Sequence, residues 1–403
     1  MYSLLKEKNE GLKDELVAFA QALIRTPSPS LHEEEIAKLV EAQMKASHYD
    51  QVLRDKVGNV IGIMRGRDAQ PTVLLNCHMD TVQAPRESLW NESPYSGSIR
   101  DGCLHGSGAA DCKGGLAAHI SVGALLKRSM LPLKGNLVVA ATAAEENGLS
   151  IGTRALIEES LPALGLQPTY AILGEPTGMG LYYGHDGWVE MDVCIEGLDP
   201  FHVDDAAEAV LQDYTHRSSS EPAEFSFTPP RFENRNGVRC ATIPVSRRLQ
   251  SAEDEQRVLT QTTREVTAMT RGTGSVAVAV AVRQERQKLY NGQTAVVRHV
   301  THAWSTDPFH PLMERARQSL LAAGCAVQPG KWNLGRIGMG TAGGLLTQFK
   351  VPTIGYGPGS EDKAHSINES VEIEKLAETV YGTAAIVHSL LGIPVFGWTS
   401  DEI

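Results

Sequence analysis

The sequence predicts an α/β protein with a central, mostly parallel sheet that is interrupted by an inserted α+β module. Two patterns support this prediction. In residues 1–183 and again in residues 298–403, short apolar runs typical of buried strands alternate with helix-like segments. In between, residues 184–297 include segments that alternate apolar and polar positions, as half-exposed strands do. We therefore expect one main domain formed by the two outer parts and a separate module formed by the middle part.

Length, composition and charge narrow the class of protein. The 403 residues are enough for two domains of about 100–200 residues each. Residues 1–16 lack the apolar core of a secretory signal, and no run approaches the roughly 18 apolar residues of a membrane span, so we expect a cytoplasmic protein without a membrane partner. Six cysteines without a C-x-x-C pair fit reduced thiols. The formal net charge of −11 argues against nucleic acid as a partner, because phosphate backbones select basic surfaces.

The outer parts contain the elements that a helix-covered sheet needs. Apolar residues at helical spacing predict a helix over residues 13–25, and Ser30-Leu31-His32-Glu33 has the form of a capping box that opens a second helix. The further expected strands are 59–64, 72–75, 136–141, 170–173 and 352–356, and the further expected helices are 114–127, 151–159, 311–323 and 373–391.

The middle part predicts a ferredoxin-like module, because its elements follow the order β-α-β-β-α-β. The expected strands are 188–195, 225–227, 238–249 and 275–282, and the expected helices are 204–211 and 253–269. We interpret residues 184–297 as an insertion into the domain formed by residues 1–183 and 298–403.

Acidic residues and histidines follow several predicted strands at the point where each strand ends. Taken singly, each has an ordinary structural explanation, such as a hydrogen-bond pair or a solvated loop. Ligand sites in open α/β sheets form at the carboxyl ends of strands, so we expect these side chains to converge. Together they supply histidine nitrogens and carboxylate oxygens without cysteine, a set that suits catalytic zinc, cobalt or manganese. The segments are His78-Met79-Asp80, Asp111, Glu145-Glu146, Glu175 and His365.

This set predicts a site for two divalent metal ions, with zinc as the expected metal and cobalt and manganese as alternatives. Two metals about 3.5–4 Å apart need one bridging carboxylate, together with a histidine and a carboxylate on each side. We expect Asp111 to bridge, His78 and Glu175 to complete one side, and His365 and Glu146 to complete the other.

Two acidic residues remain for other roles. Asp80 lies two residues after His78 and is expected to orient that imidazole through its other nitrogen. Glu145, which holds no metal in this scheme, is expected to take a proton from the attacking water and pass it to the leaving amine.

The same residues lie in motifs that resemble those of a known family. The family is that of the dizinc metallopeptidases, which includes aminoacylase, acetylornithine deacetylase, succinyl-diaminopimelate desuccinylase and glutamate carboxypeptidase. The resemblance covers nearly the whole chain. It implies a zinc-peptidase-like catalytic domain with the ligands and base named above, a cis peptide after Asp111, and a lid that also joins two chains into a homodimer through the inserted module. The matching segments are residues 74–82, 106–115, 145–148, 174–177, 357–359 and 364–369.

The resemblance also implies residues that contact the substrate. The lid histidine that stabilises the oxyanion in the family aligns best with His202, in a segment that is shorter and more acidic than usual. The lid arginine that holds a substrate carboxylate corresponds to Arg247 or Arg248. Thr341 lies in a segment where the family carries Thr-Asp-Gly, here without the acid. His185, at the junction of the two modules, is a further candidate.

One motif is typical of a different class of protein. Residues 338–343 fit the G-x-G-x-x-G fingerprint of dinucleotide-binding proteins. They follow no convincing apolar strand, so we interpret them as a loop that contacts the substrate rather than as a nucleotide site.

These observations predict a hydrolase that cleaves the amide bond of a small N-acylated amino acid. The alternatives are a dipeptidase or carboxypeptidase, or an amidohydrolase acting on a modified amino acid or an aromatic amine. A free amine on the substrate needs an acidic partner, whereas an acylated substrate needs only an arginine for its carboxylate. A catalytically silent metal-binding protein is a further alternative, which the complete ligand set and Glu145 argue against.

Overall fold

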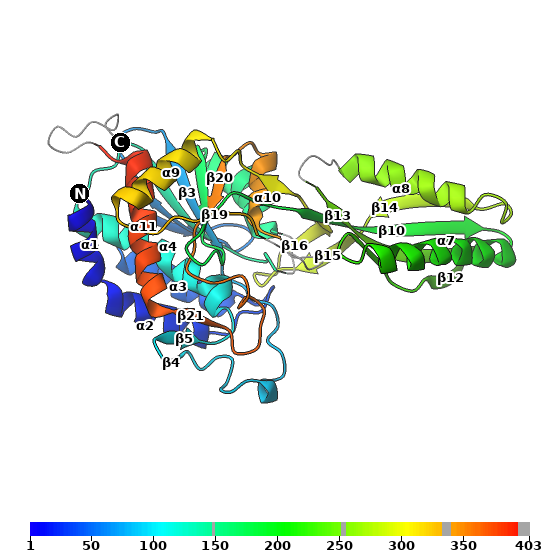
Figure 1. The fold of residues 1–403 in the computed structure, drawn as a ribbon, viewed down its shortest axis with the longest axis horizontal. Helices are drawn as coiled ribbons and strands as arrows, with labels where there is room; N and C mark the ends of the chain where they lie inside the picture. The colour runs from blue at the N-terminus through cyan, green and yellow to red at the C-terminus, as the bar shows by residue number, and fades with distance from the viewer. Residues whose placement is uncertain (147–149, 251–254, 333–339, 394–403) are drawn as a thin grey trace.

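An eight-stranded sheet forms the centre of the larger module (Figure 1). The structure is a computed structural model and describes residues 1–146, 150–250, 255–332 and 340–393. The central strands β6, β3, β7 and β20 run parallel, which confirms the predicted mostly parallel sheet. In sheet order the strands are β1 (Gln51–Arg54), β2 (Val60–Met64), β6 (Asn136–Thr142), β3 (Thr72–His78), β7 (Tyr170–Leu173), β20 (Thr353–Gly355), β8 (Leu181–Tyr182) and β19 (Pro329–Gly330).

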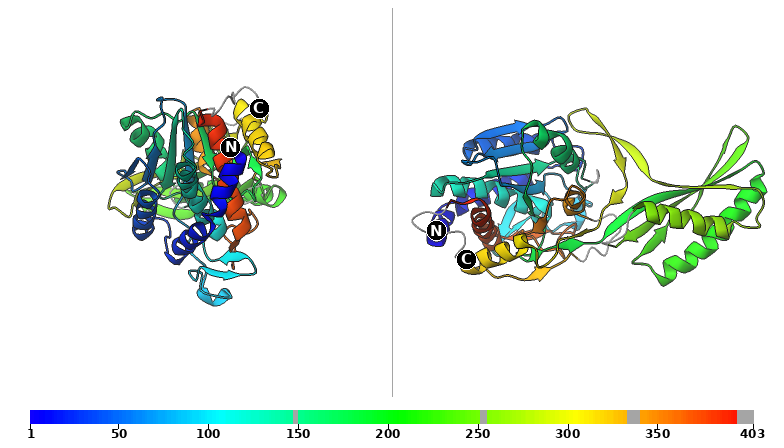
Figure 2. Two further views of the ribbon diagram at one scale, coloured as in Figure 1. Left: turned by 90° about the vertical axis from the view of Figure 1, so that its left-hand side faces the viewer. Right: turned by 90° about the horizontal axis from the view of Figure 1, so that it is seen from above.

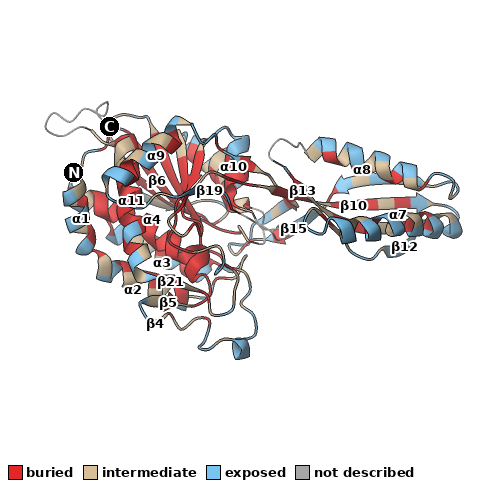
Figure 3. Cartoon of the chain, in the orientation of Figure 1, coloured by how far each residue is buried: buried red, intermediate tan, exposed pale blue. Residues whose placement is uncertain are grey.

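Helices cover both faces of this sheet, which explains why its central strands β3 and β6 are buried at every position. Along β3, Val73 and Leu75 belong to one hydrophobic core and Leu74 belongs to another. The first core also contains residues from α1 (Tyr2–Glu10), α2 (Lys13–Arg25), α3 (Glu34–Ala46), α4 (Gly114–Ser129), α9 (Pro311–Ala322) and α11 (Ile373–Leu391). The second core contains residues from η3 (Leu156–Ser160), which follows α5 (Ile151–Ala155), and from α6 (Leu161–Ala163) and α10 (Ala342–Gln348). Figure 3 shows the central strands of this sheet as buried, whereas β1 at its edge is partly exposed.

Short elements lie at the margins of the larger module. Strand β21 pairs with β5, which pairs with β4, and β18 pairs with β9. Their bounds, with those of two short helical segments, are β4 (Ser98–Arg100), β5 (Cys103–His105), β9 (Gly184–His185), β18 (Trp304–Ser305), β21 (Ser370–Glu372), η1 (Glu87–Leu89) and η2 (Ala109–Lys113).

The second module is an antiparallel sheet covered by two helices, and it projects from the larger module (Figures 1 and 2). Its main strands have the order β11-β13-β10-β14, and the chain visits them in the predicted ferredoxin-like order. A separate core lies between the sheet and the helices. The elements are β10 (Gly187–Gly197), α7 (Pro200–Ser220), β11 (Phe225–Phe227), β12 (Arg231–Arg235), β13 (Val238–Leu249), α8 (Glu255–Met269), β14 (Ala277–Val282) and β17 (Val300–Thr301).

The structure extends several predicted elements. Helix α7 runs from Pro200 to Ser220, much farther than the predicted 204–211. Its earlier start is explained by Asp199, which caps the helix by accepting a hydrogen bond from the N–H of Phe201 at 2.9 Å. The predicted start of the next helix at residue 253 lies outside the described residues. The domain boundaries at residues 184 and 298 stay predictions, and β17 continues the second sheet past residue 297.

A hairpin of the second module also contacts the larger module. Strands β15 (Gln284–Lys288) and β16 (Thr294–Arg298) form this hairpin. At its tip, the hydroxyl of Tyr290 donates a hydrogen bond to the carbonyl of Gly58 at 2.6 Å. The side-chain amide of Asn291 donates to the carbonyl of Lys56, also at 2.6 Å.

The predicted capping box is wrong. Helix α3 begins at Glu34 without a side-chain cap. The hydroxyl of Ser30 instead donates to the Asp80 carboxylate at 2.6 Å, and Oε1 of Glu33 accepts from the N–H groups of Leu31 and Ala144, both at 2.9 Å. Two of these partners, Asp80 and Ala144, are distant in the sequence, because the start of α3 packs against the ends of the central strands.

Among the residues that the structure describes, no helix is both long and apolar enough to cross a bilayer.

Candidate functional site

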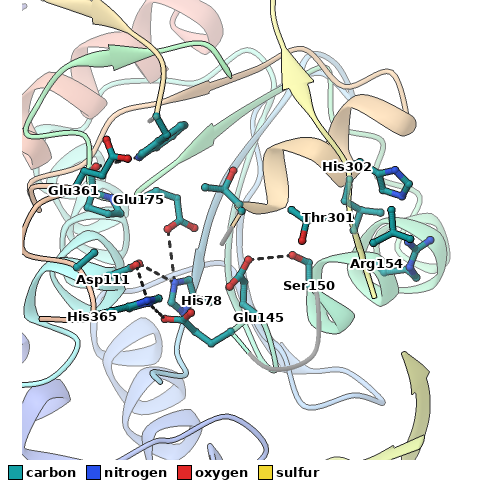
Figure 4. A pocket seen from close by; sticks show the side chains of 18 residues that line it. His78, Asp111, Glu145, Ser150, Arg154, Glu175, Thr301, His302, Glu361 and His365 are labelled. Atoms are coloured by element: carbon teal, nitrogen blue, oxygen red, sulfur yellow. Dashed lines mark hydrogen bonds and ion pairs between the residues drawn. The ribbon is translucent and has the colours of Figure 1, made fainter. Parts of the chain in front are cut away.

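A pocket opens at the carboxyl ends of the central parallel strands, where the sequence places its acidic residues and histidines (Figure 4). His78 is the last residue of β3, Glu145 follows the end of β6, and Glu175 follows the end of β7. Asp111 lies in η2 and His365 lies in a loop, and both line the same pocket. The strand ends and these two segments therefore bring the five predicted segments together.

Asp111 lies between the two histidines. Its Oδ1 is 3.2 Å from Nε2 of His78, and its Oδ2 is 3.4 Å from Nε2 of His365. Glu175 Oε2 lies 3.7 Å from the same nitrogen of His78, and Glu146 Oε1 lies 2.7 Å from that of His365. These side chains form two groups whose ligand atoms lie within 4.8 Å of one another, with Asp111 in both.

The electrostatics of the two groups favour bound cations. Burial opposes a positive charge on His365, yet the carboxylates of Asp111 and Glu146 raise its pKa to about 11. The pKa of Asp111 is lowered in spite of its burial, because both histidines donate to it. The negative charge of these carboxylates stabilises a positive charge in the site. The same side chains offer the nitrogen and oxygen ligands that a divalent metal uses.

Cys112 is an additional member of the first group. Its sulfur lies close to the ligand atoms of His78, Asp111 and Glu175, and 3.6 Å from the carbonyl of Gly174. Burial raises the pKa of the Cys112 thiol well above its usual value, so the thiol stays protonated and is a poorer ligand than the carboxylates beside it. The Asp111–Cys112 peptide bond is cis, as the family resemblance implies.

A buried glutamate holds the loop that carries Asp111. The carboxylate of Glu369 accepts hydrogen bonds from the N–H groups of Gly108, Ala110 and Asp111, each at 2.8 Å. Sequence reasoning did not predict this contact, although the position of Glu369 four residues after His365 was an available signal.

Asp80 connects His78 to the loop that carries Glu145 and Glu146. Its carboxylate accepts from the N–H of Glu145 at 3.1 Å, from the N–H of Glu146 at 3.0 Å and from Ser30. Nδ1 of His78 is 2.9 Å from the main-chain carbonyl of Asp80 and 3.6 Å from its carboxylate. The main chain of Asp80 therefore orients the imidazole, and its side chain positions the neighbouring loop.

Glu145 faces the pocket but belongs to neither group (Figure 4). The hydroxyl of Ser150 donates to its Oε1 at 3.2 Å. Burial raises the pKa of Glu145 well above its usual value, and the negative charges of Glu146 and Glu175 add to this effect. A carboxylate with a raised pKa is a stronger base for proton transfer.

Comparison with known proteins identifies the family. The profile of the peptidase family M20/M25/M40 matches residues 74–389, which is most of the chain and includes both groups. The chain belongs to this family. It is therefore a hydrolase of the M20 type.

Relatives of this M20 hydrolase span nearly its full length. It is 25% identical over 418 residues to the uncharacterized protein YgeY of Escherichia coli strain K12, covering 97% of this chain and 98% of the relative. It is also 25% identical over 426 residues to the N-formyl-4-amino-5-aminomethyl-2-methylpyrimidine deformylase of Bacillus subtilis, with 94% and 95% covered.

Solved structures share the fold. The di-peptidase Dug1p of Saccharomyces cerevisiae has a TM-score of 0.69 at 16% identity, over 96% of this chain and 98% of that one. The YXEP protein of Bacillus subtilis, described as a dinuclear metal binding peptidase from the M20 family, has a TM-score of 0.68 at 16% identity, over 94% and 98%.

In this M20 hydrolase, Thr341 lines the pocket and His185 lies behind it. Nε2 of His185 accepts from the N–H of Thr341 at 3.2 Å and lies 2.9 Å from its hydroxyl. Nδ1 donates to the carbonyl of Asp186 at 2.8 Å. Burial lowers the pKa of His185 to about 4, so its imidazole is neutral. Both nitrogens of His185 are thus engaged by the protein, and the histidine orients Thr341 toward the pocket.

The other predicted substrate contacts lie on the second module. His202 is in α7, and Arg247 and Arg248 are in β13. Arg248 forms ion pairs with Glu224, at 3.0 Å, and with Asp186. None of the three residues lines the pocket among the described residues, and their roles stay predictions.

Several residues that line the pocket carry no sequence motif and were not predicted. They are Ser150, Arg154, Thr301, His302 and Glu361. Of the predicted loop 338–343, Gly340 and Thr341 line the pocket, whereas Gly338 and Met339 lie outside the described residues.

Proposed function

We propose that the protein is a two-metal amidohydrolase that removes the acyl group from a small N-acylated amino acid. The observation that carries this proposal is the position of Asp111, whose two carboxylate oxygens face different histidines at 3.2 and 3.4 Å. A bridging carboxylate with a histidine and a carboxylate on each side is the ligand set of a two-metal hydrolase.

In this proposal, the first metal is held by His78, Glu175 and Asp111, and the second by His365, Glu146 and Asp111. The donor set fits zinc first, with cobalt and manganese as alternatives, because it combines imidazole with carboxylate. When bound, two such ions lower the pKa of a shared water and polarise the carbonyl of the scissile amide.

The remaining chemistry belongs to side chains of the protein. Glu145 takes the proton of the attacking water and delivers it to the nitrogen of the leaving amine. Ser150 holds one oxygen of Glu145, at 3.2 Å, and leaves the other free for the proton. Asp80 keeps the Glu145 main chain in place through its N–H group.

The second module is proposed to act as a lid and as the surface that forms a homodimer. His202 and one of Arg247 and Arg248 would then reach the substrate after closure, which would also expel water from the pocket. Support for this part comes from the resemblance of the inserted module to the lid of the family.

One relative bears on the nature of the acyl group. The deformylase of Bacillus subtilis, similar over nearly the whole chain, is named for an activity on an N-formyl substrate. A dipeptidase is the second candidate, because Glu361 lines the pocket and offers an acidic partner for a free amine. Acylated amino acids and dipeptides therefore both belong in a substrate panel.

Glu145→Ala tests the proposal. We expect this variant to keep its bound metal and to lose at least ~10²-fold of its turnover, in line with the contribution of a general base. Turnover of a panel of acyl amino acids and dipeptides, with and without chelator, is measured together with metal content. Glu159→Ala, an exposed glutamate on η3, is the matched control. Metal binding by the wild type without turnover of any amide would favour a silent protein, and unchanged turnover in Glu145→Ala would remove this residue from the mechanism.

A further inference from the structure

The charges around the pocket are distributed unevenly. Most charged side chains that line it are acidic, and they include the proposed metal ligands, Glu145 and Glu361. Among the described residues that line the pocket, Arg154 is the only lysine or arginine. Two bound divalent cations would offset the acidic ligands, but their charge lies at the scissile bond. Any other anionic group of a substrate therefore has one permanent cation available in this part of the protein.

Arg154 lies one helical turn from Ser150, whose hydroxyl contacts the proposed general base. Its N–H donates to the carbonyl of Ser150 at 2.9 Å, and the Ser150 hydroxyl donates to Glu145 at 3.2 Å. Residues four apart on a helix lie on the same side of it, about 5–6 Å apart. Figure 4 shows Arg154 with Thr301 and His302 at one end of the pocket, and Glu361 with Asp111 at the other end. Ser150 and Glu145 lie between these ends.

The guanidinium of Arg154 is only weakly engaged by the protein. It pairs with Glu158 at 3.1 Å, and the side chains of this pair are 49% and 43% exposed. Exposed pairs of this kind contribute little, so a substrate carboxylate in a drier pocket can replace Glu158. Arg248 differs, because it is 22% exposed and already pairs with Glu224 and Asp186.

We propose that Arg154 binds the carboxylate of the amino-acid part of the substrate and so determines specificity for substrates with a free carboxylate. This inference rests on the proposed function. It also fixes the direction of the substrate, because that carboxylate is one carbon from the scissile nitrogen. The leaving amine then lies on the Ser150 side of the pocket, next to Glu145, which protonates it. The acyl group, or the free amine of a dipeptide, points toward Glu361.

The assignment is tested by comparing how tightly the protein binds each carboxylic acid and the corresponding carboxamide. The metal-loaded, full-length Glu145→Ala variant prevents turnover, so the Kd of each N-acyl amino acid or dipeptide can be compared with that of its carboxamide by calorimetry. Adding Arg154→Ala should weaken binding of the acids by roughly 10- to 100-fold, as expected for the loss of a charge-assisted hydrogen bond, and change binding of the carboxamides by less than about 2-fold. Arg154→Lys should recover part of the loss, because it keeps the charge.

The controls separate Arg154 from the lid arginines. One of Arg247 and Arg248 is proposed to reach the substrate, so Arg247→Ala and Arg248→Ala should weaken acids and carboxamides to the same extent and leave the ratio of their affinities unchanged. Glu158→Ala should not weaken the acids. The assignment is overturned if Arg154→Ala weakens both ligands equally or neither, if Arg247→Ala or Arg248→Ala removes the selectivity instead, or if no acid binds more tightly than its carboxamide. If the acids bind selectively but the wild type turns over none of them, the proposed function is contradicted and the role of Arg154 in binding is not.

Discussion

The two halves of the proposed metal centre are built differently. The half with His78 and Glu175 lies at strand ends, and its side chains are 2% and 5% exposed. The half with His365 and Glu146 lies on loops, and its side chains are 16% and 9% exposed. His365 also has a φ of 55°, a conformation that residues other than glycine rarely adopt. The first half is thus fixed by packing of the sheet, whereas the second depends on contacts that its loops make.

Replacing Asp111 should have the largest effect on metal content and turnover, because Asp111 belongs to both halves. We expect Asp111→Ala to lose both metals and to lower turnover by more than the ~10²-fold expected for a missing general base. Metal analysis and steady-state kinetics measure the two effects, with the exposed Asp362→Ala as control. A variant that retained two metals per chain would show that Asp111 is not the bridge.

Replacing one histidine at a time should distinguish the halves. His78→Ala and His365→Ala are each expected to lose one metal, but only His78→Ala should also lower the free energy of unfolding of the metal-free protein markedly. His78 is 2% exposed, and its loss leaves the buried carboxylate of Glu175 without this partner, at a cost of about 1–3 kcal/mol. His365 is 16% exposed, so solvent can enter the space that its side chain leaves. Denaturant unfolding with chelator present checks this difference, and equal destabilisation by both variants would contradict the comparison.

Ser150→Ala should give the smallest effect, because it changes neither half. Losing one hydrogen bond to the ionised form of Glu145 should raise the pKa of that carboxyl further. The base works only when deprotonated, so the acid limb of the pH–rate profile should move to higher pH, and turnover on that limb should fall about 2- to 10-fold. Ser150→Thr keeps the hydroxyl and should restore the profile. An acid limb that does not move would show that the Ser150 contact is unimportant.

Most of the fold could be predicted because its signals are local. The buried strands and the long helices appear in the sequence as apolar runs and helical spacing, and α2 has the predicted bounds, Lys13–Arg25. The predicted ligands converge because parallel strands end at one edge of the sheet. The capping box failed because Ser30 and Glu33 have stronger partners far away in the chain, which no local pattern reveals. Arg154 was missed for the same reason, since its place in the pocket depends on tertiary packing.

The contact between the hairpin tip and the larger module links the two modules in addition to the chain segments that connect them. Tyr290 holds the carbonyl of Gly58, and a Cβ added at Gly58 would meet the tyrosine ring at 2.3 Å. The next residue, Asn59, accepts from the N–H of Ala143 at 3.0 Å and donates to the carbonyl of Gly152 at 2.8 Å. The hairpin is thus a tether that ends beside both flanks of the loop with the general base. A rotation of the outer module must therefore either break the hydrogen bonds of the hairpin tip or displace the segments on both sides of that loop.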